Sequence, residues 1–301
     1  MNDTTPDQSV TVERYDPAQP HRGKVLAAVQ ARADDIPFFC AGAVAKLLAE
    51  GYTGYLIQTT NDEKCGPTKS IGETILRNER EVEELARLLG FRKVYNLGYR
   101  NHRLDEVSPQ EIRGRMIFLF RLLKVDTVLT FNPWGPDEEN PDHYVTGHVA
   151  EEACWMAGME KDYPEQLDAV APHGVSQRYY WVARPGQPYN HVVDISAFVE
   201  AKIAAMSVNK AQGPAGSQGR RLKARLVAQG LRLPLLDGDD EAADRAYIQQ
   251  FCLGAYRELG QRHGCEYAEA FYRMPQEESF IGMDRPGTVE RYIARHAVSL
   301  T

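Results

Sequence analysis

The sequence lacks several features that would place it in a class at once. No apolar run approaches the roughly 18 residues that a membrane-spanning helix needs, and residues 1–22 contain no apolar segment of the kind that directs secretion. Basic residues are not in excess, because 35 Lys and Arg stand against 42 Asp and Glu, a net charge of −7. That balance argues against a nucleic-acid partner, since phosphate binding needs a surplus of Lys and Arg on one face.

Cysteine and glycine motifs are missing as well. No two of the five cysteines are spaced as C-x-x-C, and an odd number of thiols without such a pair fits a reducing compartment. We therefore expect a cytoplasmic protein. No G-x-G-x-x-G follows the first expected strand, which disfavours a dinucleotide-binding enzyme, and no G-x-S-x-G supports serine hydrolysis. The 43% of apolar and 26% of charged residues are those of an ordinary globular enzyme or binding protein.

What the sequence does contain is a regular alternation of strand and helix patterns. Residues 24–31 form a nearly continuous apolar run, typical of a strand that is buried on both faces. Strands that alternate with helices predict a Rossmann-like α/β fold with a mostly parallel sheet flanked by helices. The expected strands are 24–31, 55–60, 93–97 and 126–131, and the expected helices are 41–50, 73–89, 108–123 and 143–159.

The alternation loosens after residue 160. The patterns there predict strands at 178–183 and 191–194, followed by helices at 195–208 and 239–262. A basic run at 220–225 is interpreted as a solvated helix face, because short charge runs usually are. We expect an N-terminal extension, residues 1–22, that is loose or adds to an edge. A single domain, residues 23–301, should follow, and its second half should decorate the first.

Polar side chains follow the first and fourth expected strands. In an open α/β sheet, ligands bind outside the carboxyl ends of the strands. Asp34 and Asp35 come after the first strand, and His143 comes after the fourth. Two adjacent carboxylates can divide their tasks, one ligating a cation and the other taking a proton from water. Taken alone, the Asp pair is better explained as helix capping, which Asp does routinely, and His143 as an ordinary histidine at a helix start. Their combination favours a metal site, because the positions after these two strands are neighbours in such a sheet.

The motifs at the strand ends resemble those of the LmbE/PIG-L family of zinc-dependent N-deacetylases. Residues 131–148 look most like the branch of that family that includes diacetylchitobiose deacetylase. Each motif is weakly specific by itself, and their order over about 250 residues carries the resemblance. The matching segments are ARADDI (31–36), TTNDE (59–63), RNEREVEELARLLG (77–90), GYRNHRL (98–104) and FNPWGPDEENPDHYVTGH (131–148).

The resemblance implies roles for individual residues. Asp34 falls where the family keeps its general base, and Asp35 and His143 fall where it keeps two ligands of one Zn²⁺ per chain. Asp142 matches the carboxylate beside the ligand histidine and is expected to orient it, unless a backbone carbonyl does so. Asn140 stands where many members have a histidine that stabilises the oxyanion. The implied substrate-binding residues are Arg32, Arg100, Asn101 and Trp134.

Arg32 is the main departure from the family pattern, because it occupies the place of the first metal-ligating histidine. A guanidinium has no free lone pair and stays protonated, so it cannot ligate zinc. Asp35 and His143 alone leave fewer than the three protein ligands usual for catalytic zinc. Three interpretations remain open: a substitution in an otherwise active enzyme, a naturally inactive relative that holds no metal, or a site completed by another residue, with His102 the nearest candidate.

The functional expectation is therefore a zinc-dependent hydrolase that removes an N-acyl group, most often N-acetyl, from an amino-sugar-like or small amine substrate. The alternative is a metal-free binding or regulatory protein in which Arg32 pairs with Asp34 or Asp35. In both cases the partner is a small molecule, without nucleic acid or a membrane span, and the sequence leaves homo-oligomerisation open.

Overall fold

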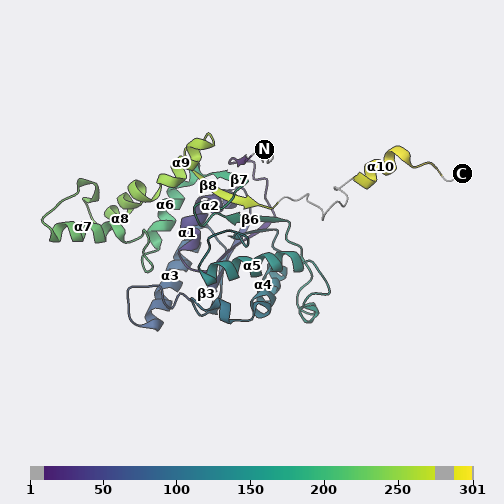
Figure 1. Cartoon of the computed structure of the whole chain (residues 1–301), viewed down its shortest axis with the longest axis horizontal. Coiled ribbons are helices and arrows are strands. Elements are labelled where there is room, and N and C mark those ends of the chain that lie inside the picture. Colours follow the sequence, from purple (N-terminus) through teal and green to yellow (C-terminus); the bar gives the residue numbers. More distant parts are fainter. Residues whose placement is uncertain (1–9, 275–287, 300–301) are drawn as a thin grey trace, which may run out of the picture.

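The computed structural model describes residues 10–274 and 288–299, which contain one eight-stranded sheet (Figure 1). The strand order is β1-β7-β8-β6-β5-β2-β3-β4. Only β8 runs antiparallel to its neighbours, so the expected α/β fold with a mostly parallel sheet is confirmed. The strands are β1 (Thr11–Glu13), β2 (Val25–Gln30), β3 (Thr53–Thr60), β4 (Lys93–Tyr99), β5 (Thr127–Phe131), β6 (Gln177–Trp181), β7 (His191–Asp194) and β8 (Ala268–Arg273).

Helices cover both faces of this sheet, and each face has its own apolar core. One face packs against α1 (Asp35–Phe39), α2 (Ala41–Ala49), α3 (Ile71–Leu89) and α6 (Val199–Val208). The other packs against α4 (Pro109–Leu123) and α5 (Pro141–Met156). No described helix is long and apolar enough to cross a membrane. The remaining α-helices are α7 (Gln218–Ala228), α8 (Asp240–Tyr247), α9 (Gly254–Arg262) and α10 (Thr288–His296).

One expected helix differs in the structure, and one expected edge extension is found. The helix expected at 239–262 is interrupted: α8 passes into a π-helical turn at Ile248–Cys252, and α9 starts afresh at Gly254. Glycine is a weak helix former, which favours a break at this point. The N-terminal extension contributes edge strand β1, which pairs in parallel with β7. This agrees with the expected edge addition, and residues 1–9 lie outside the described residues.

The second half of the chain braces the helix that follows β2. Glu269 on β8 accepts hydrogen bonds from the backbone of Gly42 (3.2 Å) and Ala43 (2.7 Å) at the start of α2. Lys202 on α6 is fully buried, pairs with Glu269 (2.6 Å) and donates to the carbonyl of Phe38 at the end of α1 (2.7 Å). The C-terminal half thus holds α1, which begins at Asp35, in place through these contacts.

Strand β2 lies at the point where the order of the sheet reverses. The chain continues from β2 to β3 on one side, while β5 pairs with β2 on the other. Ligands of open α/β sheets bind at such a switch point, beyond the carboxyl ends of the strands. Helix α5 lies close to the end of β5, because a Cβ at Gly147 would come within 3.0 Å of the Phe131 carbonyl oxygen. The loops after β2 and β5 therefore meet at one place.

Candidate active site

The loop after β2 is held by two carboxylates. Asp35 Oδ2 accepts hydrogen bonds from the backbone N–H of Ala31 (2.9 Å) and Arg32 (2.7 Å). Asp62, in the loop after β3, accepts from the backbone of Ala33 (3.1 Å). Asp62 is fully buried and adopts a left-handed backbone conformation with φ of 55°. Three consecutive N–H groups are thereby bound, so the backbone of this loop is fixed regardless of the side chain at position 32.

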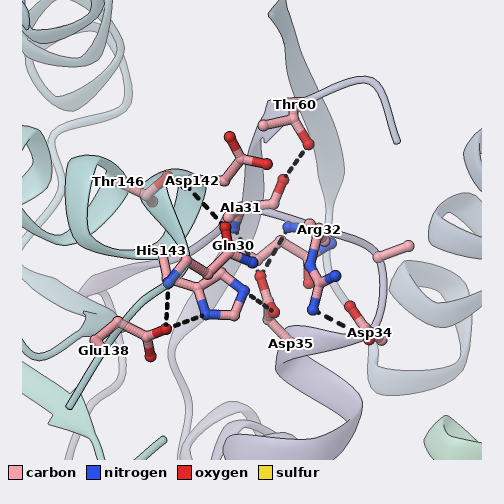
Figure 2. A network of polar contacts seen from close by, with 12 residues as sticks. Gln30, Ala31, Arg32, Asp34, Asp35, Thr60, Glu138, Asp142, His143 and Thr146 are labelled. Atoms are coloured by element: carbon pink, nitrogen blue, oxygen red, sulfur yellow. Dashed lines mark hydrogen bonds and ion pairs between the residues drawn. The ribbon is translucent and has the colours of Figure 1, made fainter. Parts of the chain in front are cut away.

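The two predicted metal ligands meet in space (Figure 2). The Nε2 atom of His143 lies 3.4 Å from Asp35 Oδ1, and both side chains are almost completely buried. The His143 ring stacks on Phe131 with 4.2 Å between the ring centroids, which fixes the plane of the imidazole. Neither Asp35 Oδ1 nor His143 Nε2 has a hydrogen-bond partner in the described chain. An imidazole nitrogen and a carboxylate oxygen that face each other in this way are a fit for a cation.

Asp34 and Arg32 are the charged side chains next to Asp35 and His143. Asp34 occupies the N-cap position of α1, but its side chain makes no capping hydrogen bond, so capping does not explain it. Its Oδ2 atom lies 3.5 Å from Arg32 Nη2, while its Oδ1 atom is buried without a partner among the described residues. Burial alone would lower the pKa of Arg32, but Asp34 and Asp35 outweigh it and hold that pKa above its ordinary value. Arg32 therefore remains a cation here.

Two functional candidates were not singled out by the sequence analysis. Glu138 Oε1 lies 3.1 Å from His143 Nδ1, on the side of the ring away from Asp35. Arg184, in the loop after β6, donates to the same oxygen at 2.9 Å. Burial alone would raise the pKa of Glu138, but the contacts with His143 and Arg184 hold it below its ordinary value. Glu138 lies within a segment that resembles the family, yet nothing in its spacing distinguishes it from Glu139.

The expected contact between Asp142 and His143 is wrong. Asp142 is fully buried and turns away to the loop after β4, where it accepts from Asn101 Nδ2 (2.8 Å) and the His102 backbone (2.7 Å). Adjacent residues at the start of a helix point about 100° apart, so Asp142 and His143 reach different loops. The Asn101 amide is occupied by this bond and by the thiol of Cys65 (3.2 Å), in a fully buried position.

The other predicted residues lie in the loops after β4 and β5. Asn140 caps α5 by accepting from the Asp142 backbone (3.0 Å), and its Nδ2 takes no part in that bond. Trp134 is 53% exposed and packs edge-on against Tyr180. Arg100 pairs with Glu63 at 2.9 Å. The side chain of His102 is exposed, and none of the described contacts joins it to Asp35 or His143.

A second group of potential ligands, Glu13, His21 and Glu50, lies at the opposite end of the sheet, before β2 and β3. The ammonium of Lys46 sits between these carboxylates, 2.7 Å from Glu13 and 2.8 Å from Glu50, and is fully buried. Because a cation already occupies this group, it is a structural ion-pair network.

Unpartnered buried polar atoms concentrate at the carboxyl ends of β2 and β5. Of the twelve buried side-chain nitrogen and oxygen atoms that lack a hydrogen-bond partner in the described residues, seven belong to this one region. Such atoms are costly unless a ligand, ion or water satisfies them. The seven belong to Arg32, Asp34, Asp35, Asp62, Glu138, His143 and Arg184, which define the candidate active site.

Asp35 makes the metal-free protein pH-sensitive. Burial, with a further contribution from Asp34, raises the pKa of Asp35 to about 6 from 3.8, against the opposing effect of His143. The folded state therefore binds this proton more tightly, and its stability falls as the pH rises from about 4 to about 6. Asp35→Asn removes the penalty, so it should raise the free energy of unfolding, and the gain should be largest above that pH range.

Urea unfolding of the metal-free protein at several pH values measures this effect. The gain from Asp35→Asn should shrink to near zero at about pH 4, where the wild-type carboxyl is also protonated. Asp105→Asn, at an exposed position, is the matched control and should change nothing. A stabilisation by Asp35→Asn that does not vary with pH would contradict this assignment.

Comparison with known proteins shows that this part of the chain is similar to one protein family. Residues 27–154 match the model of the PIG-L family, described as GlcNAc-PI de-N-acetylase. Diacetylchitobiose deacetylase from Thermococcus kodakarensis is 29% identical over 197 residues, which cover 64% of this chain and 71% of the relative. The matched span contains the loops after β2 and β5, so the resemblance drawn from the motifs is confirmed.

Solved structures show how widely the fold is shared. N,N'-diacetylchitobiose deacetylase from Pyrococcus horikoshii has a TM-score of 0.68 at 24% identity, covering 91% of this chain and 90% of that one. The 4-carboxy-2-hydroxymuconate hydratase GalB from Pseudomonas putida has a TM-score of 0.62 at 17% identity, covering 86% of this chain and 100% of that one. Since a hydratase has this fold, the fold alone does not specify amide hydrolysis.

Proposed function

Because the chain carries a PIG-L/LmbE family domain, we propose that it removes the N-acetyl group from a small amino-sugar-like substrate by hydrolysis. The observation that carries the proposal is the pair of facing, unpartnered acceptors, Asp35 Oδ1 and His143 Nε2, with the unpartnered Asp34 Oδ1 beside them. The relative whose sequence is similar is a deacetylase of diacetylchitobiose, which indicates the class of substrate.

A zinc ion fits two of the three expected ligand positions. Asp35 and His143 would hold it, whereas the protonated guanidinium of Arg32 offers no lone pair at the third position. When bound, the metal supplies a Lewis acid that polarises the acyl carbonyl and acidifies a water molecule. With two protein ligands and a neighbouring cation, we expect weak zinc binding in the chain as it stands.

The chain's own groups then account for the proton transfers. Asp34 Oδ1 is unpartnered, so it can accept the proton of the attacking water and return it to the leaving amine. The Nδ2 group of Asn140, at the start of α5, is available to donate to the developing oxyanion. Trp134 and Arg100 lie at exposed positions after β5 and β4, where a sugar ring can contact them.

A second function is favoured by one specific contact. Arg32 already pairs with Asp34 at 3.5 Å and places a positive charge beside the proposed ligands. This arrangement needs no metal, and it supports a protein that binds an N-acetylated sugar without hydrolysing it.

Acetate release distinguishes the two functions. The full-length protein is incubated with N-acetylglucosamine or N,N'-diacetylchitobiose over a series of zinc concentrations, and His143→Ala is the control for contaminating activity. We expect slow acetate release that requires added zinc and disappears in His143→Ala, because that variant loses one of two ligands.

Saturation-transfer NMR on the same sugars, without metal, completes the test. Sugar binding without acetate release at any zinc concentration would replace the hydrolase by the binding protein. If the protein neither binds these sugars nor releases acetate, both functions are refuted.

A further inference from the structure

The side of the His143 ring that faces away from Asp35 has a partner of its own. Glu138 Oε1 lies 3.1 Å from His143 Nδ1, and both side chains are at most 5% exposed. The same oxygen accepts from the backbone N–H of Asn140 at 3.2 Å, which fixes the Glu138 side chain against the first turn of α5. Glu138 therefore contacts the imidazole from a fixed position.

This contact determines which nitrogen of the ring carries the hydrogen. A neutral imidazole has one N–H, and an ionised carboxylate can only accept. Nδ1 is the ring nitrogen that makes a hydrogen bond, with Glu138 Oε1, whereas Nε2 and Asp35 Oδ1, 3.4 Å apart, both lack a hydrogen-bond partner among the described residues. The hydrogen is therefore assigned to Nδ1, which leaves the lone pair of Nε2 directed at Asp35. The opposite tautomer would leave the Nδ1–Glu138 contact without a hydrogen and would close Nε2 to any metal.

Arg184 holds Glu138 in this position. Its Nη2 atom donates to Glu138 Oε1 at 2.9 Å. The loop that carries Arg184 is clamped to the loop after β5 by Gln187, whose Oε1 accepts from the Ala183 backbone (2.9 Å) and whose Nε2 donates to the Pro136 carbonyl (3.0 Å). The position of Arg184 relative to Glu138 is thus set by backbone contacts that do not involve the metal ligands.

From this chain of contacts we infer that Glu138 is a positioning residue that selects the Nδ1–H tautomer of His143, and that Arg184 acts through Glu138. The inference rests on the proposed function, because it gives His143 the lone pair that a metal ligand needs. Outer partners of ligand histidines typically change metal affinity by about 10–100-fold. Asp142, the partner expected from the sequence, is engaged by Asn101 and His102 instead.

Long-range ¹H–¹⁵N NMR measures the tautomer directly. The sample is the unchanged protein without metal, with ¹⁵N-labelled histidine, at alkaline pH. We expect His143 to show the Nδ1–H pattern, to keep it in Glu138→Gln, whose amide oxygen can still accept, and to lose it in Glu138→Ala. Glu139→Ala removes the exposed neighbouring carboxylate and should leave the pattern unchanged. An Nε2–H pattern for His143 in the unchanged protein would overturn the inference.

Metal affinity supplies the second readout, measured with cobalt and zinc in the Arg32→His variant. Glu138→Ala in that variant should weaken binding by about 10–100-fold, Arg184→Ala should weaken it less, and Glu138→Gln should restore most of it. Urea midpoints of the metal-free variants control for folding. Unchanged affinity in Glu138→Ala, with a loss in Asp142→Asn, would transfer the role to Asp142.

The two readouts also separate this inference from the proposed function. Both the tautomer and the affinity are measured without substrate turnover. If no form of the protein releases acetate while the Glu138 variants shift the tautomer and the affinity as expected, the hydrolase fails and the positioning role stands. If acetate is released while Glu138→Ala leaves tautomer and affinity unchanged, the positioning role fails and the hydrolase stands.

Discussion

Replacing Arg32 by histidine should raise the affinity of the protein for zinc by at least about a hundredfold, more than an outer partner of a ligand typically contributes. The replacement adds a third protein ligand beside Asp35 and His143 and removes a cation from the immediate neighbourhood. The backbone at position 32 should not move, because its N–H group is held by Asp35 Oδ2 at 2.7 Å. Deacetylation should become faster together with the tighter zinc binding.

Arg32→Ala separates the two causes of this gain. It removes the positive charge without adding a ligand, so it should recover only a small part of the affinity. Arg115→His is the control, because it introduces a histidine on α4 at an exposed arginine that pairs with Glu111 and has no role in the candidate active site.

Zinc titration by competition with a chelator, and acetate release from N,N'-diacetylchitobiose, measure the result. Tight zinc binding in the unchanged protein would mean that a further ligand exists. No gain of affinity in Arg32→His would refute the assignment of position 32 as the third ligand position.

Asp34→Asn in the Arg32→His variant should lower turnover by at least about 10²-fold, the usual scale of general acid–base catalysis. Zinc affinity should change little, because Asp34 Oδ2 contacts Arg32 in the unchanged protein and Asp34 makes no described contact with His143. Asparagine keeps the shape of the side chain but cannot take up the proton of the attacking water.

Asp35→Asn in the same variant is the contrasting substitution. It should lose zinc and turnover together, because Asp35 Oδ1 is one of the two facing acceptors. The measurements are zinc affinity and kcat for both variants side by side. Equal loss of zinc and turnover in Asp34→Asn would make Asp34 a ligand and reverse the division of tasks between the two carboxylates.

The order of the first strands and helices could be predicted from the sequence because it depends on local periodicity. The apolar run at 24–31 became β2, buried along nearly its whole length, and the expected strand at 126–131 became β5. Once these strands are parallel neighbours, the loops that follow them must meet. The convergence of Asp35 and His143 at 3.4 Å follows from that topology.

The contacts between the second half of the chain and the helices next to the site could not be predicted from local periodicity. Glu269 reaches the start of α2 from a position 226 residues away, and Lys202 contacts the end of α1 from a position 164 residues away. Periodicity marks these residues only as polar positions in an otherwise apolar segment. Their partners depend on how α6 and β8 pack against α1 and α2.

The sequence by itself determined the α/β fold, the polar residues that follow the first and fourth strands, and the presence of an arginine where a ligand is expected, because strand periodicity and the chemistry of a side chain are local properties. Only the tertiary structure decided that Glu138, and not Asp142, contacts His143, and which of the two expected carboxylates, Asp34, pairs with the Arg32 side chain. Glu138, in the loop before α5, and Asp142, in its first turn, are both carboxylates close to His143 in the sequence, and spacing does not distinguish them. Which loop each one faces is fixed by helix phase and by the packing of α5 against β5, and this sets the distances at which the chemistry takes place.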